Sequence, residues 1–230
     1  MTRPNVLVVW PNRPKQMAIL EERYLLHHIW QAGDPAAMLE TVGPDVRAIV
    51  ASGEKGPDRA MVRACPKLEI VACYGVGVDA IDRVACAERG IPVTNTPEVL
   101  TEDVADMGLM LTLMVLREAV YADRYARTDR WPAEGVLRMT KCPRGMKVGI
   151  VGLGRIGKEL ARRLECIGMA IQGYHGRHEQ TGVGYRFYPD LIALAADVEV
   201  LVLCCPGGAA TQGMVGALVL EALGLSLIHI

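Results

Sequence analysis

The sequence has no long hydrophobic run, no excess of charge of either sign and no paired cysteine motif. Its longest apolar stretch, residues 108–116, is about half the length that crosses a bilayer, so the sequence predicts no transmembrane helix. The 25 Lys and Arg residues nearly balance the 26 Asp and Glu residues, which gives no general attraction to nucleic acid or to an anionic membrane. We therefore expect no nucleic acid and no membrane among its partners.

Seven cysteines are present, but none forms a C-x-x-C pair or has the spacing of metal ligands. Most stand in apolar runs, which indicates reduced, buried thiols in a cytoplasmic protein. The chain enters a short strand-like run at Asn5 instead of a signal peptide. A hydrophobic fraction of 51% excludes a disordered protein.

Short β-branched runs alternate with helix-like stretches, which is typical of a parallel sheet covered by helices. Strands are expected at residues 6–10, 26–30, 47–51, 68–73 and 92–94, and helices at residues 36–42, 57–64 and 79–88. One long helix, from Thr101 to about Arg127, would connect this domain to a second one, and Thr101-Glu102-Asp103 is typical of a capped helix start. The sequence thus predicts an α/β protein with domains at residues 1–99 and 100–230.

The alternation of strands and helices resumes after a polar stretch at residues 128–145, which either covers a partner subunit or links elements. Strands are expected at residues 147–151, 170–174 and 198–204, and helices at residues 155–167, 190–195 and 215–223.

A G-x-G-x-x-G motif lies directly after the first of these strands and opens an amphipathic helix. Gly152 would permit the tight turn, Gly154 would let the backbone approach a pyrophosphate, and Gly157 would let helix and strand pack closely. The pyrophosphate would then sit at the helix N-terminus. Glycines also gather in turns for steric reasons, but the strand and helix on either side favour dinucleotide binding. The expected cofactor-binding residues are Gly152, Leu153, Gly154, Arg155, Ile156 and Gly157.

The end of the next strand selects the cofactor. An Asp or Glu there would bind the ribose 2′-hydroxyl of NAD, whereas this chain has His175, Gly176, Arg177 and His178. An arginine can hold a 2′-phosphate, so we expect NADPH to be preferred over NADH, with His175, Gly176 and Arg177 at the site. Alternatively, Arg177 and His178 are solvated loop residues. Two histidines without a third ligand predict no metal site.

Four ordered segments carry a family resemblance. Residues 73–82 (CYGVGVDAID), 89–97 (RGIPVTNTP), 99–106 (VLTEDVAD) and 147–157 (KVGIVGLGRIG) resemble D-isomer-specific 2-hydroxyacid dehydrogenases. Residues 174–177 (YHGR) resemble the NADPH-dependent glyoxylate/hydroxypyruvate reductase branch. The resemblance implies a flavodoxin-like substrate domain followed by a Rossmann-type dinucleotide-binding domain, with hydride transfer between the nicotinamide and a small 2-keto acid.

The resemblance also implies roles for single residues. Val76 and Gly77 would present N–H groups to the substrate carboxylate, although a Gly-rich turn without a ligand is the alternative; Leu100 would flank the substrate and Val104 the nicotinamide. Cys205, Pro206 and Thr211 would lie on the adenosine side of the cofactor. Asp79 and Asp82 are expected to cap a helix, and His27 and His28 to be structural or exposed.

The family's catalytic Arg, Glu and His have no counterpart at the matched positions, so we expect no catalytic residue in this chain. Residues 225–230 (LSLIHI) depart from the family pattern and are interpreted as non-native, a translated frame of a transposase adapter. The Rossmann-type domain would then be incomplete, only its first half being present, and a chain of these residues inactive or nearly so. The complete protein is expected to be a homodimer.

The sequence favours a reductase of small 2-keto acids, and two alternatives remain open. One is a protein that senses NAD(P) with the same fold and without turnover. The other is a relative of formate or phosphite dehydrogenases.

Overall fold

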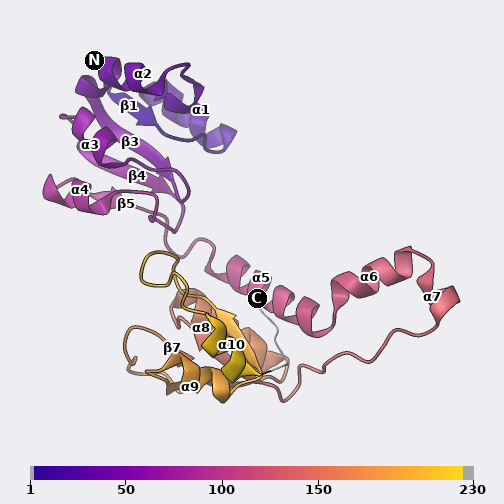
Figure 1. Cartoon of the computed structure of the whole chain (residues 1–230). Helices are drawn as coiled ribbons and strands as arrows, with labels where there is room; N and C mark the ends of the chain where they lie inside the picture. Colours follow the sequence, from indigo (N-terminus) through magenta and orange to yellow (C-terminus); the bar gives the residue numbers. More distant parts are fainter. Residues whose placement is uncertain (1–2, 225–230) are drawn as a thin grey trace. The chain divides into compact units, whose positions relative to one another are not determined.

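The computed structural model describes residues 3–224, which form two compact units (Figure 1). Unit 1 ends at Val99 and unit 2 begins at Leu100. The interpretation of residues 225–230 as non-native lies outside the described residues. Among the described helices, none is both long and apolar enough to cross a membrane.

Unit 1 is a five-stranded parallel sheet with helices on both faces. Its strand order, β2-β1-β3-β4-β5, is the flavodoxin-like order that the resemblance implies. In chain order the elements are β1 Asn5–Val8, α1 Pro14–Arg23, β2 Leu25–His28, the 3-10 turn η1 Ile29–Gln31, α2 Pro35–Val42, the 3-10 turn η2 Gly43–Asp45, β3 Val46–Ser52, α3 Arg59–Ala64, β4 Ile70–Tyr74, α4 Arg83–Glu88 and β5 Val93–Thr94.

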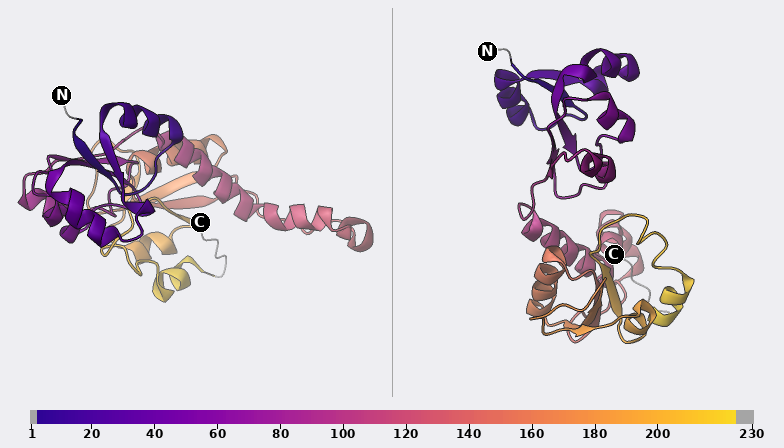
Figure 2. Two further views of the ribbon diagram at one scale, coloured as in Figure 1. Left: turned by 90° about the horizontal axis from the view of Figure 1, so that it is seen from above. Right: turned by 90° about the vertical axis from the view of Figure 1, so that its left-hand side faces the viewer.

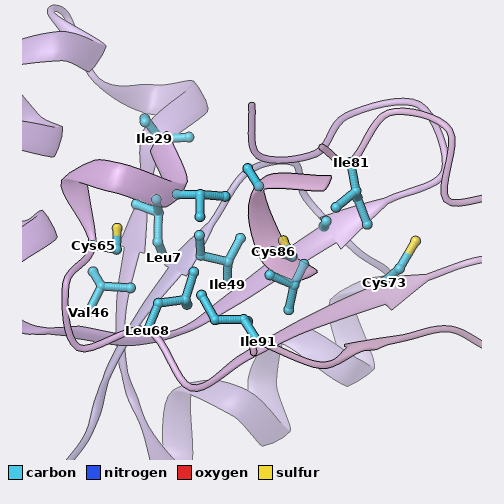
Figure 3. Packing of buried hydrophobic residues seen from close by; sticks show 14 residues of the cluster. Leu7, Ile29, Val46, Ile49, Cys65, Leu68, Cys73, Ile81, Cys86 and Ile91 are labelled. Carbon is cyan, nitrogen blue, oxygen red and sulfur yellow. The ribbon is translucent and has the colours of Figure 1, made fainter. Parts of the chain in front are cut away.

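The core of unit 1 follows from the alternation of side chains along β1. Val6 and Val8 face α1, whereas Leu7 points to the opposite side of the sheet, towards α2, α3 and α4. On that side Ile49 from β3 and Cys86 from α4 pack into the same buried cluster (Figure 3). Both faces are therefore covered, as parallel sheets require.

Unit 2 is a four-stranded parallel sheet in the order β8-β7-β6-β9. These are the first four positions of the six-stranded Rossmann order, so the Rossmann-type sheet within residues 3–224 is incomplete. Helices α5 and α8 pack on one face, and α9 and α10 on the other (Figure 2, right). The elements are α5 Thr101–Leu116, α6 Ala119–Arg127, α7 Arg130–Glu134, β6 Lys147–Val151, α8 Arg155–Cys166, β7 Ala170–His175, β8 Arg186–Phe187, α9 Leu191–Ala196, β9 Val200–Leu203 and α10 Ala217–Leu223.

Four aspartates begin helices by accepting hydrogen bonds from free backbone N–H groups. Asp34, Asp58, Asp82 and Asp190 cap α2, α3, α4 and α9 respectively. The expectation that Asp79 also caps a helix is wrong, because α4 begins only at Arg83. Thr101 is not a cap either: Leu100 holds that position without a side-chain bond, although Glu102 and Asp103 do lie in the first turn.

The single long helix predicted from Thr101 to Arg127 is wrong. It breaks at Glu118, which has a left-handed φ of 49° and separates α5 from α6. The returning segment stabilises this break, because Arg138 donates to the Glu118 carboxylate at 2.7 Å and Arg117 donates to the Thr140 hydroxyl at 2.9 Å. These contacts are distant in sequence, so helical periodicity could not reveal them.

Several smaller expectations also change. The sequence does not predict helices α1 and α7 or the short strand β8. Because β8 joins the sheet of unit 2, β9 is the fourth strand of that sheet in chain order and not the third. Unit 2 thus contains the first mononucleotide-binding half and one strand more. All seven cysteines are free, but Cys142 and Cys166 are exposed, so the expectation of buried thiols is wrong for these two.

Candidate functional site

The glycine turn between β6 and α8 has room for no residue larger than glycine at two positions. Gly152 has a φ of +93°, and a Cβ there would lie 2.6 Å from the backbone nitrogen of Cys205. A Cβ on Gly157 would collide with the carbonyl oxygen of Gly152. The Gly152 N–H donates to the carbonyl of His175 at 2.8 Å, which ties the turn to the end of β7. The turn is therefore fixed between β7 and β9.

Gly154 differs from these two glycines. Its φ is −77°, and a Cβ there would meet no atom within 4 Å. Internal packing therefore does not require a glycine at this position, and the open space lies at the start of the twelve-residue helix α8. A helix N-terminus attracts anions through its unpaired N–H groups and its dipole, so this open approach fits a pyrophosphate.

The remaining residues of the motif differ in burial. Leu153 is buried and Ile156 is half-buried, whereas Arg155 is exposed in the first turn of α8. Gln180, which was not predicted as a site residue, donates from Nε2 to the Leu153 carbonyl at 2.8 Å. No local pattern marks this residue, since it lies 27 positions away in an irregular segment.

The end of β7 brings His175, Gly176 and Arg177 next to the glycine turn. His175 Nδ1 lies 2.9 Å from the Tyr188 carbonyl, which can only accept, so Nδ1 carries the proton. His175 also lines an open cavity of about 440 Å³ together with the first residues of α9 and α10. Arg177 is exposed, and its guanidinium makes no hydrogen bond or ion pair within residues 3–224. It is thus available to an external anion.

The segment after β9 lies against the turn. Cys205 contacts Gly152 through its backbone, and Pro206 is exposed. The Thr211 hydroxyl donates to the Pro206 carbonyl at 2.9 Å, so it shapes this loop. Burial raises the pKa of the Cys204 thiol to about 11, which keeps it protonated and poorly nucleophilic at neutral pH.

In unit 1 the loop after β4 presents two adjacent backbone N–H groups. The N–H of Thr96 donates to the Gly75 carbonyl at 2.9 Å, and the Asn95 side chain donates to the Val76 carbonyl at 2.8 Å. In a trans peptide the N–H points away from the carbonyl of the same unit. Those of Val76 and Gly77 therefore point away from residues 95–96, and neither donates a hydrogen bond within the described chain. Two such donors suit a carboxylate.

Leu100 and Val104 lie one turn apart at the start of α5 in unit 2. The N–H of Val104 donates to the Leu100 carbonyl, and 38% of Val104 is exposed. Histidines 175 and 178 are not joined by further ligands: residues 3–224 hold no group of three or more His, Cys, Asp or Glu arranged for a metal ion.

A flavodoxin-like unit followed by a Rossmann-type unit with this glycine turn is an architecture suited to a nicotinamide-dependent dehydrogenase. The family model for the catalytic domain of D-isomer specific 2-hydroxyacid dehydrogenases matches residues 6–224. The chain belongs to this family of oxidoreductases.

Similarities to individual proteins support the same family assignment. The chain is 40% identical over 205 residues to glyoxylate/hydroxypyruvate reductase A of Arabidopsis thaliana, covering 89% of this chain and 65% of that protein. Its structure resembles a 2-hydroxyacid dehydrogenase from Ketogulonicigenium vulgare (TM-score 0.89, 42% identity, 100% of this chain and 72% of the other). It also resembles the NADPH-dependent glyoxylate/hydroxypyruvate reductase of Sinorhizobium meliloti in complex with NADP and malonate (TM-score 0.84, 38% identity, 97% and 69%). The chain thus spans about two thirds of the length of these relatives.

Proposed function

We propose that this protein transfers hydride between NADPH and a small 2-keto acid of the glyoxylate/hydroxypyruvate type. The names of the similar proteins from Arabidopsis and Sinorhizobium support the substrate class. Arg177 carries the proposal for NADPH, because it is an exposed cation two residues after the end of β7, where a carboxylate would repel a 2′-phosphate.

Each unit has its own role in this proposal. Residues 1–99 form the substrate domain, in which the N–H groups of Val76 and Gly77 bind the carboxylate, with Leu100 beside the substrate. Residues from 100 onward form the cofactor domain, in which the glycine turn and α8 hold the pyrophosphate, and His175, Gly176 and Arg177 hold the phosphorylated ribose. Val104 contacts the nicotinamide, and Cys205, Pro206 and Thr211 border the adenosine. When bound, the cofactor supplies the hydride that reduces the carbonyl carbon.

Binding to the 230-residue chain tests the cofactor assignment. Fluorescence titration should give tighter binding of NADPH than of NADH, and Arg177→Ala should weaken NADPH binding about tenfold or more while leaving NADH nearly unchanged. Arg127→Ala, which removes an exposed arginine of α6, serves as the matched control. Equal affinity of the unaltered chain for both cofactors would contradict the NADPH preference.

We also propose that a polypeptide of these 230 residues has little or no activity, because no matched position supplies the family's Arg, Glu or His. Loss of a general acid alone lowers rates by about 10²–10⁴-fold. A steady-state assay of NADPH oxidation with hydroxypyruvate should therefore show no turnover above background. Enzymatic turnover by the purified chain would overturn this point.

The complete protein is proposed to be a cytoplasmic homodimer. Helices α6 and α7 extend away from the sheet of unit 2 (Figure 1) and leave large apolar side chains exposed, including Val120 and Trp131 at 50% and 58%. Such an apolar surface is suited to a second copy. Light scattering should give the molar mass of a dimer for the unaltered protein and a lower mass for Trp131→Asp. The mass of a monomer for both proteins would contradict the assignment.

A further inference from the structure

Gln180 makes two hydrogen bonds that connect the cofactor-binding segments of unit 2. Its side-chain Nε2 donates to the carbonyl of Leu153 in the glycine turn at 2.8 Å. Its backbone N–H donates to the Tyr174 hydroxyl at 2.7 Å. One residue in an irregular loop is thus bound both to the turn and to strand β7.

Both partners of Gln180 are rigidly placed. Tyr174 is 1% exposed, and its ring packs against Phe187 with centroids 5.4 Å apart. Leu153 is 2% exposed and belongs to the same buried cluster as Tyr174. The two bonds therefore connect the loop to the core of unit 2, where each bond is better shielded from water than one at the surface.

The bond to Leu153 also sets the direction of the next N–H group. Because the peptide unit is planar and trans, fixing the Leu153 carbonyl makes the N–H of Gly154 point the opposite way. Within the turn, Gly154 is also the glycine at which a Cβ would meet no atom within 4 Å. Gln180 thus orients a backbone donor in the part of the turn that is proposed to bind the pyrophosphate.

The loop that Gln180 holds is the one that carries Arg177. Arg177 is the second residue after the end of β7, and Gln180 comes three residues later. The short segment between them is anchored at one end by the sheet and at the other by the two bonds of Gln180.

We propose that Gln180 is a positioning residue for NADPH, which keeps the Arg177 segment at a fixed distance from the pyrophosphate-binding turn. This inference rests on the proposed function, since it assumes that Arg177 binds the 2′-phosphate. NADPH contacts both the glycine turn and Arg177, whereas NADH has no 2′-phosphate and does not need Arg177. The loss of Gln180 should therefore weaken NADPH binding more than NADH binding.

A double-mutant cycle with the 230-residue chain tests this. Gln180→Met keeps the length of the side chain but removes its donor. It should weaken NADPH binding about tenfold and NADH binding distinctly less. In the Arg177→Ala background the same change should weaken the binding of both cofactors equally, because the coupled contact is already lost.

Gln180→Glu, whose ionised carboxylate cannot donate to Leu153, should behave like Gln180→Met. Gln16→Met, the same change at an exposed position of α1, should leave both dissociation constants unchanged.

The outcomes separate this inference from the proposed function. If the unaltered chain binds neither cofactor, or if Arg177→Ala leaves NADPH binding intact, the proposed cofactor site is wrong. If Arg177 matters but Gln180→Met affects the two cofactors equally, or shows no coupling to Arg177, then Gln180 is only structural and this inference is overturned. Thermal melting without cofactor shows whether Gln180→Met is folded. If it is not, the binding of the two cofactors to Gln180→Glu tests the inference instead.

Discussion

Each unit of this protein contains a Gly-x-Gly loop at the carboxyl end of a parallel strand, and in both loops a side-chain amide holds a backbone carbonyl. Asn95 binds the Val76 carbonyl in unit 1, and Gln180 binds the Leu153 carbonyl in unit 2. In both cases the amide comes from the segment that follows a neighbouring strand. The same device thus orients a backbone donor in two unrelated sheets.

The two loops differ in the distance from the second glycine to the next helix. In unit 2 the helix α8 begins at Arg155, immediately after Gly154, so a helix N-terminus faces the open space. In unit 1 the helix α4 begins only at Arg83, six residues after Gly77, and has six residues itself. A helix terminus suits the doubly charged pyrophosphate, whereas two free N–H groups suffice for a single carboxylate. The structural context of the loop, more than its glycines, therefore distinguishes the two proposed anion sites.

The largest expected effect comes from Gly152→Ala. The new Cβ would lie 2.6 Å from the Cys205 nitrogen at a φ of +93°, so backbone must shift and unit 2 should lose about 3 kcal/mol in its free energy of unfolding. Urea denaturation measures this loss. Gly154→Ala is the matched control: it should fold with unchanged stability but bind NADPH more weakly. Equal stability losses in the two variants would show that the turn is not built as described.

Gly75→Ala makes the corresponding change in unit 1 and should cost less. The φ of +147° is unfavourable for alanine, but a Cβ would lie no closer than 3.5 Å to any atom, the nearest being the Gly53 nitrogen. We expect a loss of about 2 kcal/mol from backbone strain alone. Gly77→Ala, where the nearest contact would be 3.8 Å away, should be close to neutral. Denaturation curves that rank these two variants in the reverse order would contradict the geometry of the loop.

These glycines illustrate how far the sequence could predict the structure. The G-x-G-x-x-G motif places the turn correctly because strand, glycines and helix are contiguous, and the alternation of elements gives both fold classes. The bonds from Asn95, Gln180 and Arg138 could not be predicted, since each joins segments between 19 and 27 residues apart through irregular backbone. Local periodicity describes contacts within an element, whereas loop positions depend on contacts between elements.

Asn95→Ala should destabilise unit 1 less than Gly75→Ala does, but it should weaken the response of the loop to a carboxylate. Removing one exposed amide hydrogen bond costs about 1 kcal/mol, but it frees the Val76–Gly77 peptide to rotate. In NMR titrations, oxalate should perturb the Gly77 amide of the unaltered chain and do so more weakly in the variant. Asn95→Asp, whose carboxylate cannot donate to the Val76 carbonyl, should resemble Asn95→Ala. Identical oxalate titrations in all three proteins would show that Asn95 does not position the loop.

The smallest expected effect is a pH dependence of stability that His27 gives to unit 1 and not to unit 2. Burial, and to a lesser degree the neighbouring His28, lowers the pKa of His27 below 6.5 in the folded state. The unfolded chain therefore binds a proton first as the pH falls, so unit 1 should lose stability below about pH 6.5, and this contribution is fully present above that value. The ring nitrogen Nε2 lies 2.8 Å from Asn5 Oδ1, and His27→Gln offers an amide there that does not titrate. Between pH 7.5 and 5.5, a range of about one unit on either side of the ordinary histidine pKa, the unaltered chain should lose more stability in unit 1 than His27→Gln does. Because the unfolding of unit 2 should not respond to this substitution, it serves as the internal reference, and the same pH dependence in both proteins would exclude His27 as the source.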